Sequence, residues 1–135
     1  MKRFIWWFML AGLAGADIDI RQGGSLWARV EDDGTIRIHG SLVGKFESDG
    51  SVRKKGSLIG QVEADGTIRE HGSLWGTLEK DGTLRVHGHL QGAVESGGTI
   101  RLHGSIWGSA DQARDHDERR RIASVLYFFS DFASR

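Results

Sequence analysis

The feature that most constrains this chain is a sixteen-residue repeat that begins at Ile18 and runs through six rows without an insertion or deletion. The rows begin at Ile18, Gly34, Gly50, Gly66, Gly82 and Gly98, and a typical row, residues 34–49, reads GTIRIHGSLVGKFESD. Eighteen of the twenty glycines in the 135-residue chain fall within these rows. Such a period indicates a fold that repeats one small structural unit six times.

Within each row, apolar and polar residues alternate. The third and ninth residues are always aliphatic, the thirteenth is apolar, the seventh is always glycine, and the eleventh is glycine except at Ala28. The other positions carry Thr or Ser, Arg, usually His, and Glu. Alternation with a period of two predicts β-strands with one buried face. The Asp-Gly pair found at most row junctions predicts a tight turn.

Two architectures agree with this pattern. Each row forms either one coil of a parallel β-solenoid or one long strand of an antiparallel β-meander. The meander requires strands of about thirteen residues, against a usual length of about 5–6, and places two glycines inside every strand, where they weaken it. We therefore predict an all-β fold, a single-stranded parallel β-solenoid of six 16-residue coils over residues 17–110. The meander of six long strands is the alternative.

A family resemblance supports the solenoid. The pattern Gly-x-aliphatic-x-Gly-x-apolar recurs at residues 40–46, 56–62 and 72–78, each time after an alternating strand such as residues 35–38. Over residues 18–110 the chain resembles the bactofilins, which are polymer-forming bacterial cytoskeletal proteins. The resemblance implies a right-handed β-helix that polymerises end to end without nucleotide, often with a short membrane-targeting segment at its N-terminus.

Two segments flank the repeats. Residues 1–16 combine a basic start, an apolar stretch that includes Phe4, Ile5, Trp6, Trp7 and Phe8, and a small-residue ending, which predicts a membrane anchor, a cap on the first coil or a signal peptide. The period breaks in residues 111–135. There, Ile122, Val125, Leu126, Phe129 and Phe132 follow helical spacing, which predicts an amphipathic helix that caps the last coil or pairs two chains.

The outward columns of the predicted solenoid could carry chemistry. Arg occupies the fourth position of all six rows and Glu the fourteenth of five, so we expect ion pairs around each Asp-Gly corner. His71, His87 and His103 would stack in one column near His89, which makes them weak candidates for a divalent metal. No acidic residue at a fixed offset completes such a site, so we predict neither metal nor cofactor.

The tenth position is large and apolar in five of the six rows, with Gln91 in the other, although the alternation predicts that it points outward. It holds Trp27, Val43, Ile59, Trp75 and Trp107. Exposed apolar side chains of this kind usually mark an interface, and Trp is enriched among binding anchors. We predict that this column is an interaction surface.

Composition narrows the function. Eighteen basic and eighteen acidic residues give a net charge of zero, so nucleic acid is not an expected partner. Six equivalent copies of Ser, His and Asp offer no singular nucleophile, so we predict no catalytic residues and no enzyme. The expected function is a structural scaffold that associates with itself, with a membrane surface as a second partner. Cytoplasmic, membrane-associated placement is preferred over secretion. The alternative is a secreted binding module whose Trp and aliphatic column contacts a glycan or protein.

Overall fold

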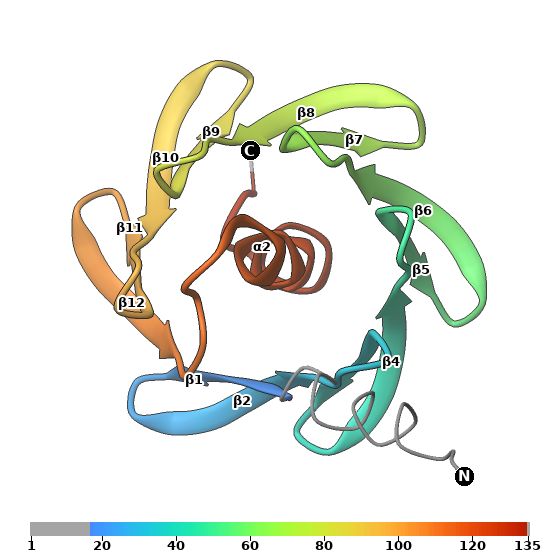
Figure 1. Cartoon of the computed structure of the whole chain (residues 1–135), viewed down its shortest axis with the longest axis horizontal. Coiled ribbons are helices and arrows are strands. Elements are labelled where there is room, and N and C mark those ends of the chain that lie inside the picture. The colour runs from blue at the N-terminus through green and yellow to red at the C-terminus, as the bar shows by residue number, and fades with distance from the viewer. Residues whose placement is uncertain (1–16, 135) are drawn as a thin grey trace, which may run out of the picture.

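The computed structural model describes residues 17–134 and shows a closed antiparallel β-barrel around an axial helix (Figure 1). Each of the twelve strands pairs with the next, and β12 pairs back with β1. The strands are β1 (Ile18–Gln22), β2 (Ser25–Val30), β3 (Thr35–Ile38), β4 (Ser41–Phe46), β5 (Ser51–Lys54), β6 (Ser57–Val62), β7 (Thr67–Glu70), β8 (Ser73–Leu78), β9 (Thr83–Val86), β10 (His89–Val94), β11 (Thr99–Leu102) and β12 (Ser105–Ala110). Helix α2 (His116–Phe129) lies at the centre of the ring.

The prediction of a parallel β-solenoid is wrong, and the barrel also contradicts the β-helix that the resemblance to bactofilins implied. The antiparallel alternative is partly right, but each row contributes two short strands rather than one long one. The reason is a two-residue turn within the row. At His39 and Gly40 the φ angles are 49° and 82°. Positive φ at both central residues makes a type I′ turn, which suits the twist of a hairpin, so the chain reverses where a solenoid would only bend.

The Asp-Gly junctions form the second kind of turn, at the opposite end of the barrel. In the first of them, Gly34 N–H donates to the carbonyl oxygen of Glu31 at 2.8 Å. The carboxylate of Asp33 accepts a hydrogen bond of 2.9 Å from the main-chain N–H of Thr35, and this bond lowers the pKa of Asp33 below its usual value. Each row is therefore a hairpin, and a four-residue turn links it to the next hairpin.

The barrel interior is lined by the columns that the alternation assigned to the core. All six side chains of the third position are buried, as are most of the thirteenth position: Ile20, Ile36, Val52, Ile68, Leu84, Ile100, Val30, Val62, Leu78 and Val94. A barrel of eight strands can be filled by its own side chains, and a wider one encloses free space. In this twelve-stranded barrel, α2 occupies that space.

Glycines of the eleventh column make room for the helix. A Cβ atom at Gly44 would collide with the ring of Phe129, and one at Gly60 would collide with the ring of Phe128. At Gly76 and Gly92 the added Cβ would collide with a main-chain carbonyl of the neighbouring strand and would lie in tight contact with the rings of Tyr127 and Phe132. Because successive residues of a helix point in different directions, residues 127–129 reach three neighbouring hairpins. These glycines are therefore packing sites for aromatic rings rather than coil corners.

The first turns of α2 bind the four-residue turns. Asp115 caps the helix by accepting a hydrogen bond of 2.8 Å from Glu118 N–H. Three consecutive arginines then reach carbonyl oxygens in different turns: Arg119 bonds Lys80, Arg120 bonds Val62 and Glu63, and Arg121 bonds Glu31 and Asp32. The helix is thus fixed to the wall at this end by guanidinium groups and at the other end by aromatic rings.

The two segments that flank the repeats, residues 1–16 and 111–135, had predicted roles as caps, anchors or contacts between chains. Ile122, Val125, Leu126 and Phe132 are fully buried and Phe129 is partly buried. They pack inside the barrel, whereas the prediction placed them over the last coil or between two chains. Phe4, Ile5, Trp6, Trp7 and Phe8 lie outside the described residues. Within residues 17–134, no helix has both the length and the apolar character needed to cross a membrane.

Candidate functional site

A β-bulge in every hairpin sets which side chains face solvent. In the hairpin of β3 and β4, Ile36 pairs with Gly44 and Arg37 pairs with Leu42, which leaves Val43 as an extra residue. The same register shift occurs in the other five hairpins. An extra residue moves the alternation by one position. Leu42 therefore faces solvent beside Arg37, and Val43 packs against the core.

The prediction that the tenth column points outward is wrong for this reason. Trp75 is only 6% exposed, and Trp27, Val43, Ile59 and Trp107 are partly buried against the core. The ninth column is the exposed one. We call it the leucine ring: Leu26, Leu42, Leu58, Leu74, Leu90 and Ile106, with exposed fractions between 45% and 68%. It encircles the barrel near the two-residue turns, because each member is the second residue after such a turn.

The tryptophans support the helix. The Trp75 ring lies edge-on to Tyr127 at 5.1 Å and to Phe128 at 5.2 Å between ring centroids. The Trp107 ring meets Phe132 at 5.7 Å in the same manner and Trp27 at 5.4 Å. Edge-to-face pairs at these distances stabilise a buried cluster. Trp75 thus packs against α2 itself, and Trp107, with Trp27 beside it, packs against Phe132 just beyond the end of the helix.

Ion pairs cross each four-residue turn, as the spacing of the Arg and Glu columns predicts. Arg37 Nε donates to Glu31 Oε2 at 2.9 Å. Four further pairs repeat this geometry at 2.7–3.1 Å: Arg53–Glu47, Arg69–Glu63, Arg85–Glu79 and Arg101–Glu95. The arginine side chains are about two-fifths exposed, so each pair contributes little to stability. Together they place alternating charges on the outer wall beside the leucine ring.

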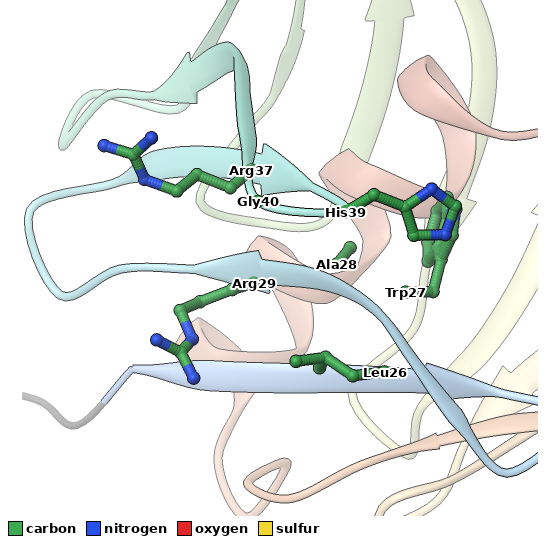
Figure 2. A pocket seen from close by; sticks show the side chains of 7 residues that line it. All are labelled: Leu26, Trp27, Ala28, Arg29, Arg37, His39 and Gly40. Carbon is green, nitrogen blue, oxygen red and sulfur yellow. The ribbon is translucent and has the colours of Figure 1, made fainter.

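Shallow grooves lie between neighbouring hairpins. They are on the side of the two-residue turns, where the strands of the two hairpins no longer pair. The groove drawn in Figure 2 encloses about 200 Å³ between the first two hairpins. One side is formed by residues 26–29, and the other by Arg37, His39 and Gly40. Trp27 and His39 lie together at one end of this groove, whereas Arg29 and Arg37 extend toward the other end. Two later grooves have the same construction, at residues 58–61 with His71 and Gly72, and at residues 42–45 with Arg53, Lys55 and Gly56.

The histidines do not stack. His71, His87 and His103 each occupy the first position of a different two-residue turn, with φ near 50°, and His89 follows one of these turns. Within residues 17–134, no three His, Cys, Asp or Glu side chains come together in a group that could hold a metal ion. The column that a solenoid would have formed is instead spread around the rim of the barrel.

Comparisons with protein-family models, with curated proteins and with solved structures find no match to this chain. The leucine ring and the grooves are the two surface features that recur around the barrel.

Proposed function

We propose that this protein is a non-enzymatic structural scaffold that associates laterally with further copies of itself through the leucine ring. The observation that carries the proposal is the exposure of six large aliphatic side chains, 45–68% each, at equivalent positions around one molecule. The core does not require them, since the bulge directs them to solvent and the tenth column supplies the packing. Apolar side chains repeated on a surface in this way usually mark an interface.

The immediate surroundings favour a second copy as the partner. Leu42 lies across the strand pair from Arg37, which is bonded to Glu31, so an apolar side chain and both signs of charge share one patch. Such a patch is complementary to a copy of itself turned through a two-fold axis. The net charge of zero adds no long-range repulsion between copies. A closed barrel has no free sheet edge, so the proposal does not include polymerisation by pairing of edge strands.

The geometry also sets the strength of association. When two barrels lie side by side with parallel axes, their rings meet at the same height, but each contact uses only one or two of the six aliphatic side chains. A stable interface buries about 800 Å² on each partner, which is far more than such a contact offers. We therefore expect single contacts to be weak and assembly to require several neighbours at once. Confinement at a membrane through residues 1–16 would favour it.

The test is sedimentation velocity of the full chain over a wide concentration range. Wild-type protein is expected to be monomeric when dilute and to form large species over a narrow range of higher concentration. A variant with all six ring residues changed to Ser should stay monomeric throughout. The control changes Thr35, Thr67 and Thr83 to Ser, because Ser51 already holds the equivalent position of its own row. Monomeric wild-type protein at every concentration, both free and on vesicles, would overturn the proposal.

A further inference from the structure

The three described grooves share one construction but differ in charge. The groove between the second and third hairpins, which we call the lysine groove, encloses about 360 Å³ and is lined by Thr35, residues 42–45, Arg53, Lys55 and Gly56. The next groove along the barrel encloses about 340 Å³ and is lined by residues 58–61, His71 and Gly72. Lys45 and Lys55 of the first groove thus stand where the second has Gln61 and His71. The repeat supplies an uncharged counterpart of nearly the same size.

Lys45 also lines a second hollow with Asp33, Glu47 and Asp49, but neither lysine of the groove is held in an ion pair. Neither the Lys45 nor the Lys55 ammonium group forms an ion pair with any residue among 17–134. Arg53 is already engaged, since its Nε donates to Glu47 at 3.1 Å and its Nη1 donates to the carbonyl oxygen of Gly56 at 3.3 Å. No carboxylate lines the lysine groove. Lys45 helps to lower the pKa of Asp33, after the larger effect of the Thr35 hydrogen bond.

The floor of the lysine groove is apolar. Leu42 is 62% exposed, Val43 packs against the core, and Gly44 completes this part of the lining. The ring of Phe129 lies directly behind Gly44 on the inner side of the wall. Apolar side chains beside two cations fit a ligand that carries a negative charge at one end of an apolar body.

We propose that the lysine groove binds a small amphipathic anion, with its carboxylate or phosphate head between Lys45 and Lys55 and its apolar body against Leu42 and Val43. Such a ligand has two sources, a free amphiphile or the exposed part of an anionic lipid, and they share this chemistry. The lysine groove shares Leu42 with the leucine ring, so its test uses dilute protein, in which the ring is unoccupied.

The first measurement is a titration of ¹⁵N-labelled protein with octanoate, followed by amide chemical shifts. The amides of Lys45, Lys55 and Gly56 are expected to move, whereas those of Gln61, His71 and Gly72 serve as the internal reference. Octanol tests the apolar body alone, inorganic phosphate tests the head alone, and octyltrimethylammonium tests the opposite charge. Equal shifts in both grooves, or equal effects of octanoate and either octanol or octyltrimethylammonium, would overturn the proposal. Phosphate that binds as tightly as octanoate would also overturn it.

The repeat also provides the matched variants. Lys45→Gln with Lys55→His converts the lysine groove into its neutral counterpart, and octanoate affinity is expected to fall about tenfold or more, because a charge-assisted contact is lost. Gln61→Lys with His71→Lys should create a second site at residues 58–72. Unchanged affinity in the first variant, in protein that retains its fold, would contradict the inference.

Vesicles distinguish the two sources of ligand. Co-sedimentation of dilute wild-type protein with phosphatidylglycerol vesicles, but not with phosphatidylcholine vesicles, together with its loss in the Lys45→Gln, Lys55→His variant, would identify a lipid head group. Octanoate binding without vesicle binding would identify a free amphiphile. Absence of binding to both octanoate and phosphatidylglycerol vesicles would overturn the proposal and leave the self-association experiment unaffected.

Discussion

The phenol hydroxyl of Tyr127, in the central helix, donates a hydrogen bond of 2.7 Å to the main-chain carbonyl oxygen of Arg85 in β9. Tyr127 is 2% exposed, and its ring lies over Gly76 in the adjacent strand β8. The residue therefore joins α2 to the barrel wall through both a polar and an apolar contact. Because it is the only tyrosine of the chain, its contribution can be isolated.

Tyr127→Phe should lower the free energy of unfolding by about 1–2 kcal/mol, since the ring contacts remain while the Arg85 carbonyl loses its partner. Urea denaturation followed by tryptophan fluorescence measures the change, because Trp75 lies against the Tyr127 ring. A variant as stable as wild type would show that the hydrogen bond contributes nothing to holding the helix.

Alkaline pH should destabilise the wild-type protein more than Tyr127→Phe. Burial raises the pKa of Tyr127 well above its ordinary value of 10.0. The unfolded chain therefore loses the phenol proton near pH 10 while the folded chain keeps it, so stability is full below that pH and falls above it. The tyrosine adds a slope of about 1.4 kcal/mol per pH unit. Identical pH dependence of unfolding in the two proteins would contradict this assignment.

Substitution by alanine should distinguish glycines that pack against the helix from glycines with free space around them. Gly44→Ala places a Cβ against the Phe129 ring and the carbonyl of Arg53, so we expect a loss of about 1–3 kcal/mol in the free energy of unfolding. Gly97→Ala is the control, because nothing lies near its added Cβ and its φ is not positive; its effect should stay within about 0.5 kcal/mol. Thermal denaturation of both variants measures the difference. Equal losses would show that the helix does not press on the eleventh column.

The fold could be predicted only in part, because several of its determinants look alike in the sequence. The alternation correctly places Ile36 in the core, and the column spacing correctly pairs Arg37 with Glu31. A glycine such as Gly40 serves equally well as a solenoid corner or in a type I′ turn. What decides between them is the positive φ of the preceding His39, which the sequence does not display. The role of Gly44 depends on Phe129, which is 85 residues away in the chain and adjacent only once the barrel closes.

The lysine groove and the leucine ring could not be predicted from the sequence for a similar reason. Lys55 visibly interrupts the histidine column, but its relation to Lys45 depends on the pairing of β4 with β5, in which Lys45 lies opposite Arg53. The alternation alone places the leucine ring in the core. The extra residue of each bulge reverses the direction of the side chains along the strand, so these leucines face solvent instead. Because every row contains the same bulge, the extra residue does not interrupt the sixteen-residue period, and the sequence does not reveal it.

Arg120→Met should destabilise the protein by about 2–4 kcal/mol. Arg120 is 8% exposed and donates to the carbonyl oxygens of Val62 at 2.7 Å and Glu63 at 3.0 Å, and also to Asp117 at 3.0 Å. Loss of hydrogen bonds from a buried charged group leaves these carbonyls unsatisfied. Arg114→Met, in the same segment but with its side chain 75% exposed, is the control. Chemical denaturation that ranks the two variants equally would show that Arg120 does not fix the helix to the turns.

Leu74→Ser and Trp75→Ser provide the direct test of the bulge. These neighbours are 56% and 6% exposed, respectively, and Trp75 packs edge-on against Tyr127 and Phe128. Leu74→Ser should change the free energy of unfolding by no more than about 0.5 kcal/mol, because the leucine side chain lies largely in solvent. Trp75→Ser should cost about 3–5 kcal/mol, because it leaves a cavity beside the helix. Strict alternation without a bulge predicts the reverse order, so thermal and urea denaturation of the two variants decide which face of the strand is buried.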